Sequence, residues 1–378
     1  MRREELGHLP IARGLSGILL LALSCALACW AQEAPLNHAL NEQIVLIRHG
    51  AGVELETTIF KPDGNGPFPL ALINHGKAFG NPRFQPRARY IVATRELVRR
   101  GYAVAIPMRG GFSKSSGMYV EGGCNIEGNA NYQAGYLRTA LDWLVQQPYV
   151  DRKRIVVMGQ SHGGLTAMAF AAEPYDGVLG VMNFAGGLRL SGDRCTNWES
   201  SLISAFRSFG GSTRISSLWF YGENDSYFNP DLVKRMYAAF SAAGGKAKLI
   251  AYGPFKGDAH GTFSDRDGLS IWWPEADSFL NSLALPTALL PRAASEDPAI
   301  AALEDIKRIP FINSACTRTY NLFLDADYPR AYAISTDGHC GYAYGGEDPR
   351  KRAVEFCQKR AQEPCRLYAV DNGVVWHN

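Results

Sequence analysis

A short apolar strand that runs directly into a tight turn and then a helix is the feature that most constrains the fold. The turn, at residues 159–163, reads Gly-Gln-Ser-His-Gly. Residues 154–158 before it are apolar and rich in β-branched side chains, and residues 165–172 after it suit a helix packed on a sheet. Such a strained turn brings backbone segments too close for a Cβ atom, which explains the flanking glycines. The pattern therefore predicts that Ser161 is presented at the end of a buried strand.

Segments typical of buried strands alternate with segments typical of helices along residues 43–283. Strands are expected as a hairpin over 43–60 and then at 70–74, 103–106, 154–158, 177–184, 217–221 and 248–251. Helices are expected at 87–100, 132–146, 165–172, 232–243 and 271–283. Alternation of this kind predicts an α/β fold, with a doubly wound and mostly parallel sheet covered on both faces.

The composition changes after residue 283, which predicts a second, smaller domain. Residues 284–300 are rich in Ala, Pro, Leu and Ser and are expected to form a linker. Residues 301–378 then form a small αβ module, with a helix from Asp348-Pro349 to about residue 362 and a hairpin at 371–373. A module of this size buries little core, so its four cysteines are expected to staple it. The larger domain is expected at residues 32–283.

The N-terminus, residues 1–31, is expected to be a cleaved signal peptide. Arginines precede a short apolar run at residues 18–28, and small residues follow it. This predicts a bacterial protein exported to the periplasm or secreted, with a membrane anchor as the alternative. No later segment has transmembrane character. The net charge of +3 comes without any basic block interleaved with aromatic residues, so nucleic acid is not expected as a partner.

Two of the eight cysteines lie in the signal region, and the other six are expected to form disulfides in an exported chain. Cys124 and Cys195 lie in loops after strands, at the same end of the sheet, and are expected to pair. Cys357 lies near the end of the tail helix and Cys365 begins the next strand, so they are expected to pair, which leaves Cys316 with Cys340. The absence of a C-x-x-C pair argues against zinc, and neither metal nor cofactor is expected.

A serine nucleophile needs a base and a carboxylate that orients the base. In this architecture both follow later strands, in the order serine, acid, histidine. Asp225 follows the strand at 217–221 and is the expected acid, with Glu223 as the alternative. His260 lies in a glycine-containing loop after the last strand and is the expected base.

An oxyanion that forms during attack by serine needs two backbone N–H donors. One is expected from His162, which follows the serine. The other is expected from Lys77, because His75-Gly76 follows the strand at 70–74 and the glycine lets the chain turn. The side chains of His75 and His162 are expected either to line the cleft or to pack behind it.

With these motifs in place, residues 42–283 resemble the α/β-hydrolase superfamily, and within it the dienelactone-hydrolase-like and prolyl-oligopeptidase-like serine hydrolases. The resemblance rests on His75-Gly76, on the segment 101–110, on the turn at 159–163, on residues 222–225 and on residues 257–260. It implies the fold and the serine, acid and histidine triad. Dienelactone hydrolases use a cysteine nucleophile, whereas this chain has Ser161. The tail resembles small cysteine-bearing domains of bacterial exported proteins, and its partner is unknown.

These features favour hydrolysis of a small-molecule carboxylic ester through an acyl-serine intermediate. A peptidase or amidase would use the same triad, and a non-catalytic binding protein on a hydrolase scaffold is a further alternative. The glycine- and serine-rich segment 109–131 is the expected lid.

Overall fold

The computed structural model describes residues 36–50, 52–190, 194–290, 302–326, 329–345 and 348–376. The expected signal peptide at residues 1–31 lies outside these residues.

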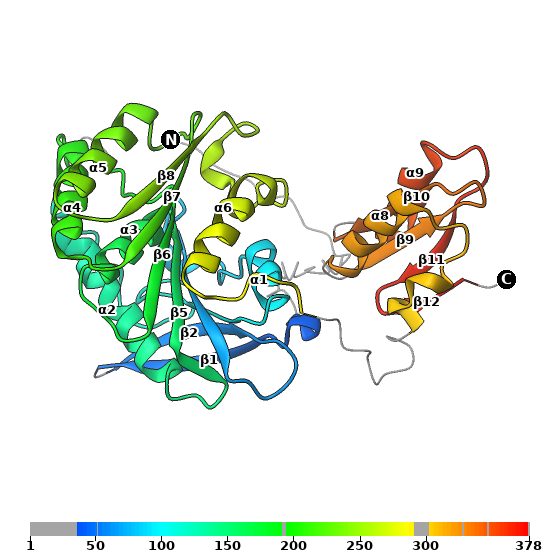
Figure 1. Cartoon of the computed structure of the whole chain (residues 1–378), viewed down its shortest axis with the longest axis horizontal. Coiled ribbons are helices and arrows are strands. Elements are labelled where there is room, and N and C mark those ends of the chain that lie inside the picture. Colours follow the sequence, from blue (N-terminus) through cyan, green and yellow to red (C-terminus); the bar gives the residue numbers. More distant parts are fainter. Residues whose placement is uncertain are drawn as a thin grey trace, which may run out of the picture. The chain divides into compact units, whose positions relative to one another are not determined.

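The larger domain is built on an eight-stranded sheet (Figure 1). Its strands are β1 (Gln43–His49), β2 (Val53–Phe60), β3 (Phe68–Asn74), β4 (Ala103–Pro107), β5 (Val150–Gln160), β6 (Val178–Phe184), β7 (Ser216–Gly222) and β8 (Ala247–Tyr252). They lie in the order β1-β2-β4-β3-β5-β6-β7-β8. The strands from β4 to β8 pair in parallel, whereas β2 is antiparallel to both β1 and β4. The predicted hairpin and mostly parallel sheet are confirmed.

Helices cover both faces of this sheet. They are α1 (Ile91–Val98), α2 (Ile126–Leu144), α3 (His162–Ala171), α4 (Trp198–Ser212), α5 (Pro230–Ala242) and α6 (Leu269–Ser282). Apolar residues of α2, α3, α4 and α5 share one core with one face of the sheet, and those of α1 and α6 share another core with the opposite face. The chain is therefore doubly wound, as predicted. Short 3₁₀ turns occur at His38–Leu40 (η1), Pro82–Phe84 (η2) and Ala259–Gly261 (η3).

In the larger domain, two helices differ most in their bounds from the predictions and one was not predicted. Helix α2 begins at Ile126 rather than at residue 132, because the Asn125 side chain accepts a hydrogen bond from the Gly128 amide and caps it. The last part of the expected lid, residues 126–131, is therefore helical. Helix α1 is shorter than predicted, since Tyr90 before it has a left-handed conformation with φ of 42°. Helix α4 was not predicted, because glycines and serines interrupt its apolar pattern.

A buried ion pair joins the segment before β1 to the segment before α1. The Glu42 carboxylate accepts hydrogen bonds from Arg87 at 2.7 Å and from Arg89 at 2.8 Å. Burial raises the pKa of Glu42, but the hydrogen bonds from Arg89 and Arg87 outweigh it and hold that pKa below its usual value.

The tail module has its own four-stranded antiparallel sheet, in the order β10-β9-β11-β12 (Figure 1). Its elements are η4 (Ile306–Arg308), α8 (Ser314–Leu324), β9 (Arg330–Ile334), β10 (Cys340–Tyr344), α9 (Pro349–Gln358), β11 (Arg366–Val370) and β12 (Gly373–Val374). The Asp348 side chain caps α9 by accepting from the Lys351 amide, as the sequence predicts. Helix α9 ends four residues earlier than expected, and β10 was not predicted.

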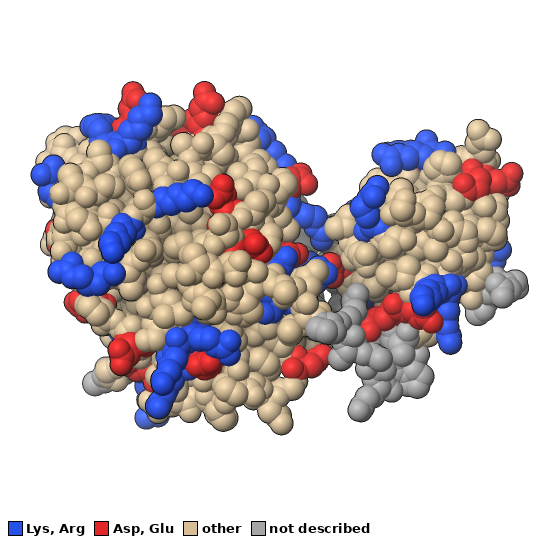
Figure 2. All heavy atoms as spheres, in the orientation of Figure 1, with Lys and Arg blue, Asp and Glu red and all other residues tan. Residues whose placement is uncertain are grey.

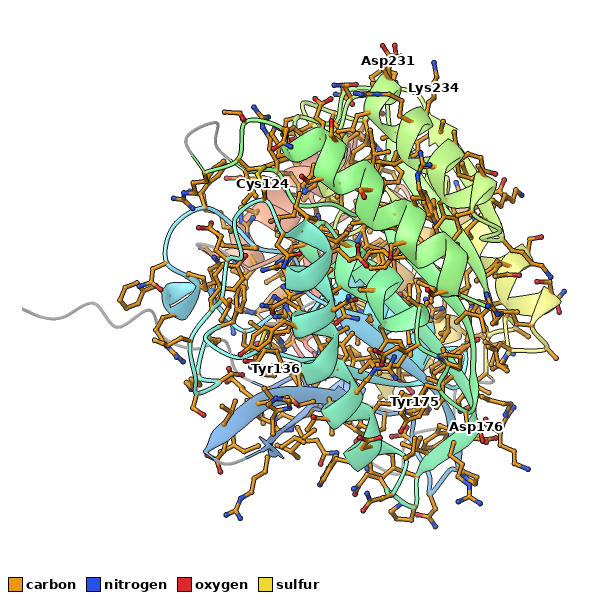
Figure 3. The ribbon with its side chains drawn as sticks, turned by 90° about the vertical axis from the view of Figure 1, so that its left-hand side faces the viewer. Cys124, Tyr136, Tyr175, Asp176, Asp231 and Lys234 are labelled. Carbon is orange, nitrogen blue, oxygen red and sulfur yellow. A yellow bond between two sulfur atoms is a disulfide. The ribbon has the colours of Figure 1, made fainter. Side chains whose placement is uncertain are left out.

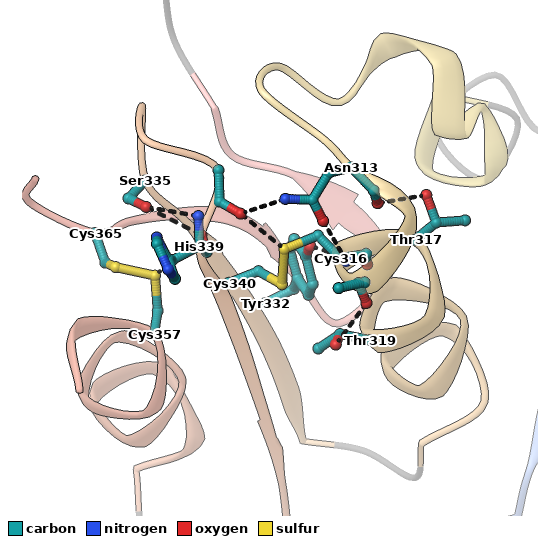
Figure 4. Close-up of a disulfide and its surroundings, with 12 residues drawn as sticks. Asn313, Cys316, Thr317, Thr319, Tyr332, Ser335, His339, Cys340, Cys357 and Cys365 are labelled. Carbon is teal, nitrogen blue, oxygen red and sulfur yellow. Dashed lines mark hydrogen bonds between the residues drawn. A yellow bond between two sulfur atoms is a disulfide. The ribbon is translucent and has the colours of Figure 1, made fainter. Parts of the chain in front are cut away.

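Three disulfides join the pairs that the sequence favoured. Cys124 bonds to Cys195, with Cα atoms 5.1 Å apart, and Figure 3 shows Cys124 close to the start of α2. In the tail, Cys316 bonds to Cys340 and Cys357 to Cys365 (Figure 4). The first pair of the tail ties α8 to the sheet, and the second ties the end of α9 to β11.

Acidic and basic side chains are interspersed over the face of the molecule shown in Figure 2. Within the described ranges, no helix is long and apolar enough to cross a membrane. The same part of the chain contains no cluster of His, Cys, Asp and Glu that could hold a metal ion.

Candidate active site

Ser161 lies at a sharp turn between β5 and α3, as the sequence predicts. Its backbone is strained, with φ of 57° and ψ of −126°. A Cβ atom at Gly159 would lie 2.1 Å from the Gly163 carbonyl oxygen, and one at Gly163 would lie 2.2 Å from that of Asn74. The turn therefore needs glycine at both positions, because backbone atoms occupy the space of any side chain there.

Asp225 and His260 come from the loops after β7 and β8 and contact each other. The two carboxylate oxygens of Asp225 lie 3.0 and 3.2 Å from His260 Nδ1. Asp225 is buried, whereas the alternative acid, Glu223, is exposed. Because Nδ1 must donate to the carboxylate, Nε2 of the neutral ring keeps its lone pair. The pair thus has the arrangement of a general base with its orienting acid.

The Asp225 carboxylate is itself fixed by the backbone. Its Oδ1 atom accepts hydrogen bonds from the amides of Tyr227 at 2.8 Å and Phe228 at 3.0 Å. The position of the carboxylate is thus set by the turn after β7.

The His260 backbone is held on two sides. Its amide donates to Asp258 Oδ1 at 2.9 Å, and Asp258 also bonds the Ser226 hydroxyl at 2.7 Å. Burial raises the pKa of Asp258, but the hydrogen bonds from Ser226 and the His260 amide lower it overall. The His260 carbonyl accepts from Gln160 Nε2 at 2.9 Å, so His260 is tied to the residue that precedes Ser161.

A cavity opens beside Ser161, walled by the loops that follow five neighbouring strands. Its lining consists of Lys77, Ala78, Phe79, Tyr119, Glu121, Ser161, His162, Gly187, Leu188, Arg189, Leu190, Tyr227 and Phe228. The expected oxyanion residues, Lys77 and His162, thus lie on the same cavity as Ser161. Burial lowers the pKa of the Lys77 ammonium, which lies 5.5 Å from the centre of the Tyr119 ring.

The imidazoles of His75 and His162 are both buried. Nε2 of His162 lies 2.8 Å from Asn129 Oδ1. Nε2 of His75 accepts the Arg109 amide at 3.0 Å. Both rings are therefore held by hydrogen bonds to neighbouring residues and support the site from within the protein.

Three residues outside the predicted set, Tyr90, Arg109 and Gln160, also hold the site together. The Tyr90 hydroxyl accepts from the Gly76 amide at 3.1 Å and donates to Gln160 Oε1 at 3.2 Å. The Arg109 guanidinium donates to the His75 carbonyl at 2.8 Å. Gln160 could have been singled out by its place in the turn motif, and Arg109 as a charged residue directly after a buried strand.

Comparison with known proteins supports this architecture. Residues 51–189 match the sequence model of the X-Pro dipeptidyl-peptidase (S15) family. No curated protein matches the chain.

Solved structures with similar folds include esterases and peptidases. A thermophilic esterase of Thermogutta terrifontis is 17% identical, with a TM-score of 0.49 over 68% of this chain and 98% of that one. An esterase of Pyrococcus furiosus is 16% identical, with a TM-score of 0.49 over 67% and 97% of the two chains. A Bacteroides ovatus protein assigned as a dipeptidyl aminopeptidase IV is 14% identical, with a TM-score of 0.51 over 64% of this chain and 35% of that one.

The chain has the α/β-hydrolase fold. The match of residues 51–189 to a peptidase family, together with this fold, supports a hydrolase.

Proposed function

We propose that this chain hydrolyses carboxylic esters through an acyl-serine intermediate. Ser161 attacks the carbonyl carbon, while His260 accepts the serine proton and then delivers it to the departing alcohol. Asp225 fixes the tautomer of His260, and the amides of Lys77 and His162 bind the oxyanion. Water then repeats the sequence to release the acid. The observation that carries the proposal is the contact of buried Asp225 with half-buried His260, attached through Gln160 to the strained turn that bears Ser161.

The charges on the cavity support an ester over a dipeptide-releasing activity. An enzyme that removes dipeptides has to accept the positively charged amino terminus of its substrate. Among the described residues that line the cavity, Glu121 is the one carboxylate, and Arg194 already pairs with it. Lys77 and Arg189 place two positive charges on the same lining. A cationic amino terminus would therefore be disfavoured there, whereas a neutral or anionic ester would be accepted.

A peptidase of the same triad is the second candidate, and the match of residues 51–189 to a peptidase family favours it.

A fluorophosphonate probe separates both enzymes from a non-catalytic scaffold, because it reacts only with an activated serine. We expect it to label Ser161 in the wild type and not in Ser161→Ala. p-Nitrophenyl esters of graded chain length, compared with X-Pro p-nitroanilides, then separate the two activities. Faster turnover of the anilides than of the esters would show that the proposed activity should be peptidase rather than esterase.

We further propose that the protein acts outside the cytoplasm. Three disulfides among the described residues support this, because such bonds persist in oxidising compartments.

A further inference from the structure

We propose that Arg109 and His75 form a positioning unit, which holds the Gly76–Lys77 peptide so that the Lys77 amide hydrogen faces the reacting carbonyl at Ser161. The inference rests on the proposed function and adds to it two residues that do not touch the substrate.

The hydrogen bonds of His75 define its tautomer. The Arg109 backbone amide can only donate, and it lies 3.0 Å from His75 Nε2, so Nε2 must be the unprotonated nitrogen. The ring proton is then on Nδ1, which lies 2.7 Å from the Gly76 carbonyl oxygen and donates to it. Burial, and next the nearby Arg109 charge, hold the pKa of His75 well below its usual value, so the ring stays neutral at working pH.

Fixing the Gly76 carbonyl also fixes the Lys77 amide. In a trans peptide the carbonyl and the following N–H point in opposite directions, so a carbonyl held toward His75 turns the amide hydrogen the other way. The peptide lies close to the nucleophile, since a Cβ atom on Gly76 would be 3.3 Å from Ser161 Cβ. The Lys77 residue lines the cavity with Ser161.

Arg109 connects the two segments that supply the oxyanion donors. Its Nη2 atom donates to the His75 carbonyl at 2.8 Å, and its Nη1 atom donates to Thr166 Oγ1 at 2.9 Å. Thr166 in turn donates to the His162 carbonyl at 2.8 Å. One guanidinium group therefore braces the chain on both sides of the proposed oxyanion hole.

The charge of Arg109 is unusual for a structural residue. The side chain is fully buried, yet no carboxylate within the described ranges forms an ion pair with it. Burial lowers its pKa to about 10, so the group remains charged at neutral pH. A buried cation normally needs an anion nearby. An oxyanion that forms at Ser161 would supply this negative charge transiently. The Arg109 cation would therefore stabilise the oxyanion relative to the neutral substrate.

Two substitutions at His75 separate positioning from simple stability. Asparagine places a donor where Nδ1 lies and can still bond the Gly76 carbonyl, whereas glutamine places its polar atoms where Nε2 lies and cannot. Each variant loses one of the two ring hydrogen bonds, so similar losses of thermal stability are expected. We expect His75→Gln to lower kcat for a neutral p-nitrophenyl ester about 100-fold with little change in KM, since one oxyanion donor is misplaced. The kcat of His75→Asn should be higher than that of His75→Gln by about tenfold or more.

Active-site titration with a fluorophosphonate gives the folded fraction of each variant. Equal kcat values for His75→Asn and His75→Gln, or a loss confined to KM, would overturn the proposal. If neither variant folds, Arg109→Lys provides the test, because lysine keeps the charge but cannot bond both His75 and Thr166. It should lower kcat about tenfold at unchanged KM, and an unchanged kcat would refute the role. If Ser161→Ala loses activity while both His75 variants keep the kcat of the wild type, this proposal is refuted and the proposed function stands.

Discussion

Replacing Asp225 by asparagine tests the proposed triad most directly, because the structure dictates how the new side chain must lie. The Oδ1 atom of Asp225 accepts two backbone amides, so the carbonyl oxygen of asparagine will take that place. Its NH₂ group then faces His260 Nδ1, where the carboxylate now accepts. That contact stabilises the opposite tautomer of His260, with the proton on Nε2, which can no longer accept the proton of Ser161.

The size of the effect follows from the cost of the alternative orientation. Turning the amide to restore the working tautomer would place its NH₂ group against two amide donors and leave both unsatisfied. At about 1–3 kcal/mol for each buried donor, the cost is about 2–6 kcal/mol. This corresponds to a kcat lower by a factor between about 30 and about 26,000. We expect a value in the upper part of this range, because Asp225 is buried and little water can satisfy the donors.

The assay is the steady-state hydrolysis of a p-nitrophenyl ester, with folding checked by circular dichroism. Glu223→Gln is the matched control, because it makes the same chemical change two residues away at an exposed carboxylate. It should retain activity within about threefold, as surface substitutions usually perturb little. A loss of less than tenfold in Asp225→Asn, or a larger loss in Glu223→Gln, would refute the assignment of the acid.

Three further predictions concern stability. Replacing Cys124 and Cys195 together by serine should lower the free energy of unfolding in urea by up to about 4.4 kcal/mol, since the bridge spans 71 residues. Removing the bridge between Cys357 and Cys365, which spans 8 residues, should lower it by about 2.5 kcal/mol. The reverse order would contradict the dependence on loop length. Gly159→Ala should yield little folded, probe-reactive protein, because its Cβ atom would meet a carbonyl oxygen at 2.1 Å, and normal yield and labelling would show that the turn can relax. Because the pKa of Glu42 is lowered in the folded state, its ionised carboxylate stabilises the fold above about pH 4.5, and this contribution is lost as the pH falls through the folded-state pKa. Glu42→Gln should therefore lower the free energy of unfolding at pH 7 and make that free energy depend less on pH in acid. An unchanged dependence on pH in acid would refute this.

The larger domain could be predicted from the sequence because parallel strands buried on both faces give short apolar runs with clear ends. The strands β3, β4 and β7 are of this type, and each was expected within two residues of its observed bounds. Helix α4 was missed because its serines, together with the pair Gly210-Gly211, weaken the helical pattern, and packing against α5 compensates. In the tail, β10 was missed because its alternation is of small with aromatic residues and lacks the usual apolar and polar contrast.

The candidate site residues could be proposed from the sequence because the topology places the ends of parallel strands at one edge. The order of Ser161, Asp225 and His260 along the chain follows from that topology. The supporting hydrogen bonds were not accessible, since they join loops whose paths no periodic pattern describes. The bond from the Arg109 amide to the His75 ring is one example, and the bond from Gln160 to the His260 carbonyl is another.

Gln160 fills the variable position before the nucleophile, and its side chain connects segments from three parts of the chain. Its Oε1 atom receives the Tyr90 hydroxyl, which holds the Gly76 amide, while its Nε2 atom holds the His260 carbonyl. The loop that carries the proposed base, His260, and the loop that carries a proposed oxyanion donor, Lys77, are thus both linked to the strand that ends next to Ser161, the second of them through Tyr90. Movement of the His260 loop away from Ser161 breaks its hydrogen bond to the Gln160 amide group, whereas movement of the Gly76 loop breaks its hydrogen bond to the Tyr90 hydroxyl, which is itself bonded to Gln160. Opening one loop should therefore weaken the hold on the other. The site should accordingly assemble and come apart as a unit, with the base and the oxyanion loop arriving together.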